Sequence, residues 1–200
     1  MKKNFTILLF LVLTASVAAQ SRGIAIISYS AGTNNTLFRN AATFPATDGM
    51  TGLGAMSFGL EYVYPMNNWL SAEAGLNYSY ELFKKKVADS QSESGYATSN
   101  VNVNLITIPV GFRINFLKYG FIQTGAMLDL LYEPGIGSYF GCGVQYQTEY
   151  GLGFVLSPYV KFHSFLPLNF NMDANRILDR GVKIGISYSI DYFLEHNNKK

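Results

Sequence analysis

Most of the chain after residue 20 alternates between apolar and polar positions with a period of two, which is typical of β-strands whose faces meet different surroundings. The alternation is clearest over residues 69–83. One face there carries Leu70, Ala72, Ala74, Leu76, Tyr78, Tyr80 and Leu82. The other carries Ser71, Glu73, Gly75, Asn77, Ser79 and Glu81. Residues 181–193 repeat the pattern, so both segments are predicted to be strands with one apolar and one polar face.

The same reading gives eight strand segments, near residues 23–32, 52–64, 69–83, 101–116, 120–132, 138–148, 152–164 and 181–193. Two shifts of phase, at Ile26-Ile27 and at Leu105-Ile106, are interpreted as β-bulges. The segments are long enough for tilted strands that cross a bilayer, which need ~9–11 residues. The sequence therefore predicts an all-β fold, an eight-stranded antiparallel up-and-down transmembrane β-barrel.

The positions of the charged residues follow the same alternation of faces. Every charged residue within these segments falls on the less apolar face: Glu61, Glu73, Glu81, Arg113, Asp129, Lys161, Lys183 and Asp191. A charge that faced lipid near the bilayer centre would cost ~2–4 kcal/mol, so a membrane barrel must keep its charges inward.

The alternation alone also fits a soluble barrel with an apolar lumen. Two features favour a membrane barrel over a soluble one. Small residues on the polar face suit a narrow interior: Gly59, Gly75, Gly111, Gly125, Gly143, Gly153 and Gly185. Aromatic residues near strand ends on the apolar face, together with Trp69, which begins the third segment, resemble an interfacial girdle: Tyr62, Tyr64, Tyr78, Tyr80, Tyr132 and Tyr192.

The beginning of the chain has the pattern of an export signal. Lys2 and Lys3 precede an apolar run, and Val17-Ala18-Ala19 fits a signal peptidase site. We expect a signal peptide at residues 1–19 and a barrel domain at residues 20–200; a retained anchor is the alternative, which the shortness of the apolar run disfavours.

Composition narrows the class of protein. The chain is 48% hydrophobic and 14% charged with 19 glycines, more apolar than an average soluble domain. A net charge of +2 gives no reason to expect nucleic acid, and the single cysteine, Cys142, excludes an internal disulfide framework. Outer-membrane lipid is the expected surrounding.

The connections alternate in length. Short ones are predicted at residues 65–68, 117–119 and 149–151, and longer ones at 33–50, 84–100 and 164–180, with a modest one at 133–137. In bacterial barrels, short turns face the periplasm and long loops face outside. Both termini are therefore expected in the periplasm.

Two local motifs carry a family resemblance. The run Ile106-Thr107-Ile108-Pro109-Val110-Gly111-Phe112 and the glycines Gly141 and Gly143 resemble the outer-membrane β-barrel family of Bacteroidetes that includes PorT-like proteins, and small OmpX-like barrels. The resemblance covers essentially the whole mature chain, and it implies an accessory role in a surface or secretion assembly. The last strand also resembles an assembly signal of the kind that barrel-insertion machinery recognises, with Lys183, Gly185, Tyr188 and Ile190 at suitable spacing. It departs from the usual pattern because the chain continues past Phe193 by seven residues.

No catalytic residue, cofactor or metal site is predicted. His163 and Ser164 form the one His–Ser neighbourhood, but adjacent strand residues point to opposite faces and no acid is adjacent in sequence. A polar lumen histidine is therefore favoured over a lipid-modifying enzyme. Cys142 is expected to be a small hydrophobe on the lipid face.

Three features could carry function. The inward charges form either a packed plug, which is favoured, or a narrow channel for small solutes or ions. Lys84, Lys85 and Lys86 either bind lipopolysaccharide phosphates or form an ordinary solvated charge run, with equal weight. The apolar stretch in 164–180 packs on the barrel mouth, slightly favoured, or docks a membrane protein partner through Phe165, Leu166, Leu168 and Phe170. The expected function is that of a non-enzymatic outer-membrane protein.

Overall fold

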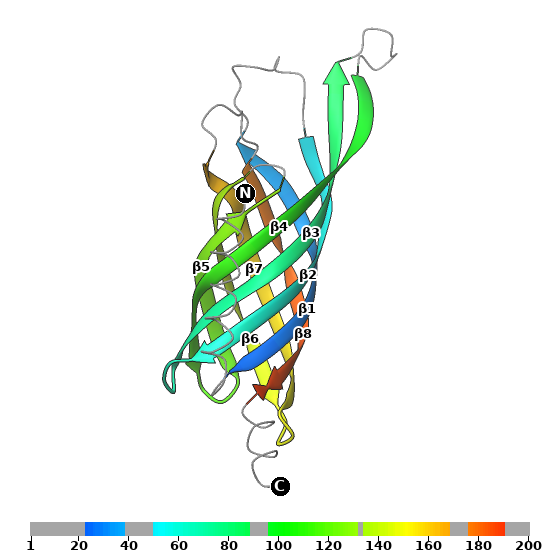
Figure 1. Ribbon diagram of the computed structural model, residues 1–200. Helices are drawn as coiled ribbons and strands as arrows, with labels where there is room; N and C mark the ends of the chain where they lie inside the picture. Colours follow the sequence, from blue (N-terminus) through cyan, green and yellow to red (C-terminus); the bar gives the residue numbers. More distant parts are fainter. Residues whose placement is uncertain (1–22, 39–49, 89–95, 132–133, 169–175, 191–200) are drawn as a thin grey trace, which may run out of the picture.

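A computed structural model describes residues 23–38, 50–88, 96–131, 134–168 and 176–190. It contains eight strands: β1 (Ile24–Phe38), β2 (Met50–Pro65), β3 (Leu70–Ala88), β4 (Tyr96–Phe116), β5 (Gly120–Asp129), β6 (Gly135–Gln147), β7 (Leu152–Pro167) and β8 (Arg176–Ser189). Each strand pairs antiparallel with its neighbours in sequence, and β1 pairs with β8 to close the barrel (Figure 1). The predicted fold class is confirmed. Within the described ranges, no helix is long and apolar enough to span a bilayer. The expected signal peptide at residues 1–19 lies outside these ranges.

Apolar side chains cover the outside of the barrel. On β4 the outward positions from Ile106 to Phe116 are all apolar: Ile106, Ile108, Val110, Phe112, Ile114 and Phe116. At a rise of ~3.3 Å per residue and a tilt of ~40°, these positions cover ~25 Å, the height of the lipid-facing band of such barrels. Above Ile106 the outward residues become Asn104, Asn102 and Asn100, and the Tyr78 hydroxyl donates to Asn104 Oδ1 over 3.0 Å at this boundary.

The two β-bulges expected from the sequence were wrong. The register of β1 is continuous through Ile26 and Ile27 on both sides, and that of β4 is continuous through Leu105 and Ile106. Register shifts occur instead between Thr36 and Phe38 of β1, and at two further places, between Gly52 and Gly54 and between Ile136 and Ser138.

The reason for the error is that some apolar residues face inward. Ile26, Val63, Phe121 and Val155 form a buried cluster near the short-turn end of the barrel, here called the lower apolar cluster. Phe83, Val103, Leu105 and Ile177 form a second one, the upper apolar cluster. Apolar residues on both faces of one strand imitate a shift of phase in the sequence.

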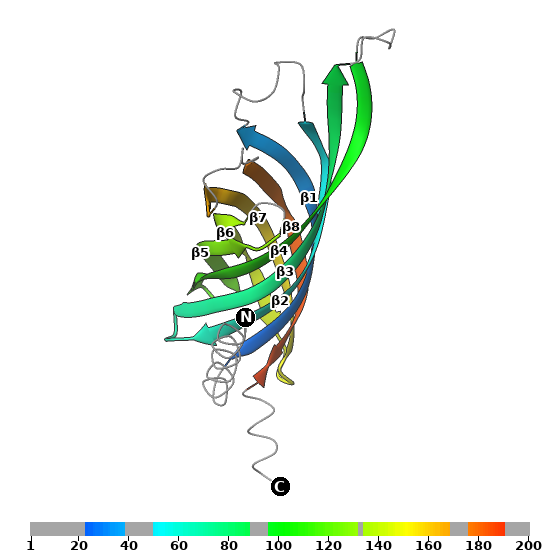
Figure 2. The ribbon, with the colours of Figure 1, turned by 45° about the horizontal axis from the view of Figure 1, so that its top comes forward.

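The strands continue further on the long-loop side than the sequence predicted. Figures 1 and 2 show β3 and β4 as a hairpin that projects beyond the rest of the barrel. Its ladder runs to the pair Ala88–Tyr96, whereas pairing of β4 with β5 begins at Thr107. In the described part of the chain, residues 96–105 therefore pair on one side only. Lys84, Lys85 and Lys86 belong to β3 and do not follow it, and β7 and β8 extend into the predicted loop at 164–180.

Candidate functional site

The barrel interior gathers the charged residues singled out by the sequence. Glu73, Glu81, Arg113, Asp129 and Lys183 are buried. Glu61 and Lys161 are partly buried and line a lumen cavity together with Glu73 and Lys183. Asp191, the eighth residue of the set, lies outside the described residues.

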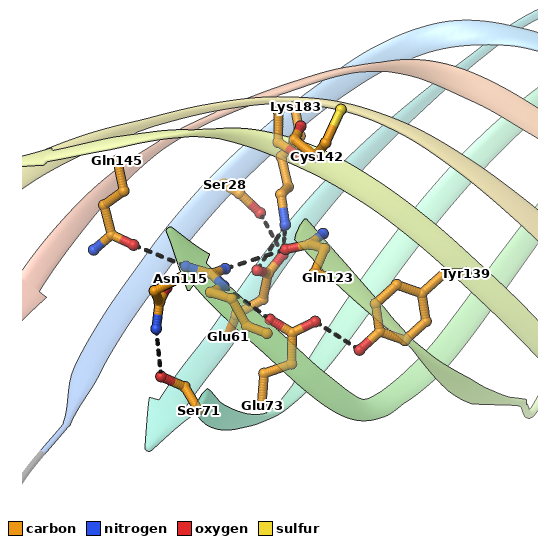
Figure 3. Close-up of polar contacts among 12 residues, drawn as sticks. Ser28, Glu61, Ser71, Glu73, Asn115, Gln123, Tyr139, Cys142, Gln145 and Lys183 are labelled. Atoms are coloured by element: carbon orange, nitrogen blue, oxygen red, sulfur yellow. Dashed lines mark hydrogen bonds and ion pairs between the residues drawn. The ribbon is translucent and has the colours of Figure 1, made fainter. Parts of the chain in front are cut away.

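Arg113 is the centre of one group, the Arg113 network. Its Nε donates to Glu73 Oε2 over 3.2 Å, Nη1 to Gln145 Oε1 over 2.8 Å, and Nη2 to Gln123 Oε1 over 3.2 Å (Figure 3). The Tyr139 hydroxyl donates to the other Glu73 oxygen over 2.7 Å. The guanidinium is 1% exposed, so this fork of donors and acceptors compensates for the loss of water around a charge.

Two glycines make room for this network. A Cβ atom at Gly111 would lie 2.5 Å from the Tyr139 hydroxyl, and one at Gly125 would lie 2.8 Å from the Tyr139 ring. The inward glycines thus let the Tyr139 side chain approach the backbone of β4 and β5, which a side chain at either position would prevent.

Glu61 and Lys183 form a second ion pair beside the Arg113 network. Lys183 Nζ donates to both Glu61 oxygens, at 2.9 Å and 2.8 Å, and Ser28 Oγ donates to Oε1 over 3.3 Å (Figure 3). The two residues come from β2 and β8. The contact therefore spans β1, which lies between β2 and β8, and neutralises both charges.

A cavity of about 40 Å³ lies among these groups. That volume holds only a few water molecules. Arg113 stacks over the ring of Phe121, with 4.1 Å from Cζ to the ring centroid, and Phe121 belongs to the lower apolar cluster. The members of the upper apolar cluster are at most 3% exposed. In the described part of the chain, the lumen is thus packed on both sides of the cavity.

His163 lies higher in the lumen and has an acidic partner that the sequence did not reveal. Its Nδ1 is 2.9 Å from Asp129 Oδ1. Ser164 donates to Asp129 Oδ2 from its backbone N–H over 2.6 Å and from Oγ over 3.2 Å. The expectation that Ser164 points away from His163 was wrong: both side chains are buried, because Ser164 adopts a left-handed conformation with φ of 49°.

This geometry does not make Ser164 a nucleophile. A serine hydroxyl is activated when it donates to the free histidine nitrogen, with the acid on the other nitrogen. Here the Ser164 hydroxyl and His163 Nδ1 share the Asp129 carboxylate.

Glu81 and Asp179 complete what we call the His163 cluster, which consists of Glu81, Asp129, His163 and Asp179. One ligand-type atom from each of Glu81, His163 and Asp179 lies within 4.8 Å of the others, and all are buried. The sequence offered no metal-ligand cluster because these residues come from three different strands. Asp179 was missed because it was assigned to a loop, yet it shares the inward parity of Lys183.

The other residues that the sequence singled out lie outside the lumen where the structure describes them. Lys84 and Lys86 are exposed on the projecting hairpin. Phe165, Leu166 and Leu168 are 54–58% exposed, and Leu166 pairs with the exposed Ile136, so it continues the apolar outer wall; Phe170 lies outside the described residues. Cys142 is exposed on the outer wall.

Comparison with known proteins shows a shared fold and identifies no family. No family model matches the chain, and no curated protein matches it. The crystal structure of the outer membrane protein OprG from Pseudomonas aeruginosa superposes with a TM-score of 0.50 at 10% identity, over 86% of this chain and 97% of that one. Outer membrane protein AlkL in lipid bilayers gives 0.49 at 11% identity, over 86% and 90%. Ail of Yersinia pestis, in complex with a heparin analogue, gives 0.39 at 12% identity, over 83% and 99%.

Proposed function

We propose that this chain is a non-enzymatic integral protein of a bacterial outer membrane that acts through its projecting β3–β4 hairpin, as an accessory subunit of a surface or secretion assembly. Its termini face the periplasm and the hairpin stands outside the cell. The observation that carries the proposal is the combination of a packed lumen with a hairpin that leaves one edge of β4 unpaired in the described chain.

The packed lumen argues against transport as the main activity. A channel needs a continuous path, whereas here the cavity of about 40 Å³ is lined in part by ion-paired side chains, and two clusters of buried apolar side chains fill other parts of the lumen. Eight-stranded barrels commonly have interiors filled by side chains. A rigid, filled barrel is a suitable support for an element that projects from the membrane.

The hairpin has the properties of a docking element. An edge strand presents backbone N–H and C=O groups that another chain can pair with. Most of its outward side chains above the lipid band are polar, and Asn100, Asn102, Lys84 and Lys86 are exposed to solvent. The lysines are also placed to contact lipopolysaccharide phosphates beside the barrel. The family resemblance of the segment Ile106–Phe112 is the reason to expect a secretion assembly.

The test is to shorten the hairpin. Residues 85–99 are replaced by Asn-Gly, which closes a tight turn between β3 and β4 without changing the lipid band. Tagged protein is extracted gently from native outer membranes and its co-purifying proteins are quantified by mass spectrometry. We expect a stoichiometric partner with the native chain and at least a tenfold loss with the shortened one.

The control is Lys118→Gln, a charge change in the exposed turn at the opposite end of the barrel. It should leave the partner in place. A native chain that purifies alone, or a partner retained equally by the shortened chain, would contradict the proposal.

A further inference from the structure

The upper lumen holds a group of side chains whose geometry the proposed function does not use. His163 is 2% exposed and Glu81 is 0% exposed. In the described part of the chain, neither His163 Nε2 nor Glu81 Oε1 has a hydrogen-bond partner. The two atoms face each other at 3.9 Å, too far for a hydrogen bond. Unpartnered buried polar atoms are costly, so a pair of them aimed at one point calls for a ligand.

We propose that Glu81, His163 and Asp179 bind one divalent transition-metal cation, of which Zn²⁺ is the best representative. The ligand atoms lie within 4.8 Å of one another. Around tetrahedral zinc, ligand atoms at ~2.0–2.2 Å from the metal are ~3.4 Å apart. Side-chain movements of about 1 Å would bring the three atoms to that spacing. An imidazole with carboxylates favours zinc or its neighbours over calcium or magnesium, which prefer all-oxygen sites.

Asp129 holds the His163 ring with Nε2 directed toward Glu81. Its Nδ1 lies 2.9 Å from Asp129 Oδ1, and a neutral imidazole that donates from Nδ1 leaves the lone pair on Nε2. This acid–histidine arrangement behind the metal is a recurrent feature of zinc sites, where the acid fixes both the orientation and the tautomer of the ligand.

The two carboxylates have orienting partners as well. Asn34 Nδ2 donates to Glu81 Oε2 over 3.2 Å, which leaves Oε1 directed at His163. The Tyr159 hydroxyl donates to the Asp179 carboxylate, 3.4 Å from Oδ1 and 3.2 Å from Oδ2. Each of the three ligands is thus supported by one further residue, as preorganised metal sites require.

The local charge fits a cation. Lys161 lies opposite Asp179 in the β7–β8 ladder. One ammonium beside the carboxylates of Glu81, Asp129 and Asp179 leaves an excess of negative charge, which a divalent cation neutralises. Because the site is buried, the metal enters while the barrel folds, and it then joins β3, β7 and β8 across the lumen.

The experiment is refolding of the full barrel domain into detergent micelles with EDTA or with Zn²⁺, followed by dialysis, elemental analysis and thermal unfolding. We expect one zinc per chain. The unfolding temperature should rise by ~5–10 °C at free zinc about 100-fold above the dissociation constant. Ca²⁺ and Mg²⁺ should give no rise.

Glu81→Gln and Glu73→Gln form a matched pair, since both change an inward carboxylate of β3 into an amide. Glu81→Gln and Asp179→Asn should refold but lose the zinc and the temperature rise, whereas Glu73→Gln should keep both. A native chain without zinc, or equal zinc in all three variants, would overturn the site. Partner binding by the hairpin does not require the metal, so loss of zinc should leave the partner in place.

Discussion

Replacing Arg113 by Met is expected to lower the free energy of unfolding by ~3–5 kcal/mol. The change removes the donors to Glu73, Gln123 and Gln145 at once. It leaves the Glu73 carboxylate, which is 7% exposed, with the Tyr139 hydroxyl as its remaining donor. An unpaired buried charge costs more than the pair contributes, so the effect comes mainly from the residue left behind.

The measurement is urea unfolding of the barrel reconstituted in phospholipid vesicles. The control is Lys118→Met, which removes an exposed cation from a short turn and should change the free energy by less than ~0.5 kcal/mol. The double variant Arg113→Met with Glu73→Gln should recover part of the loss, because no buried charge is then unpaired. Equal stability of the Arg113 and Lys118 variants would show that the network contributes nothing.

Replacing Val110 by Arg is expected to cost ~2–4 kcal/mol in the same assay. Val110 is 56% exposed and lies in the middle of the outward apolar run of β4. A soluble barrel would accept an arginine at an exposed outer position with almost no loss. The cost arises only if hydrocarbon surrounds this face.

Asn102→Arg is the matched control, since it lies on the same strand and the same face but above the lipid band. It should change the free energy by less than ~0.5 kcal/mol. If both arginines are tolerated equally, the outer wall does not face lipid.

The alternation of apolar and polar residues predicted the fold because each strand has one face toward the lumen and one face toward the outside. It failed where that rule is broken locally. Ile26 and Leu105 are apolar but point inward, into the two apolar clusters, and were mistaken for β-bulges. Lys84, Lys85 and Lys86 were taken as the end of a strand because three charges interrupt the alternation, yet β3 continues beyond the lipid band where polar residues on both faces are tolerated.

The lumen contacts were less accessible to sequence reasoning. The charged residues were recognised as inward-facing, but their partners depend on the register and tilt of all eight strands. Arg113 of β4 and Gln145 of β6 are 32 residues apart in sequence and meet over β5, which lies between their strands. His163 and Asp129 are 34 residues apart, and Ser164 points inward only through its left-handed backbone. A single sequence carries no signal for either contact, whereas Asp179 was within reach by extending the alternation of β8 backward.

Cysteine labelling in intact cells tests the central claim, a barrel that crosses the outer membrane with its hairpin outside. In a Cys142→Ser background, Asn102→Cys and Val110→Cys place a thiol on the same face of β4, above the lipid band and within it. A membrane-impermeant maleimide should label Cys at position 102 in intact cells. It should label Cys at position 110 only after the barrel is unfolded in detergent. Equal labelling of both in intact cells, or labelling at 102 only after the outer membrane is broken, would contradict the account.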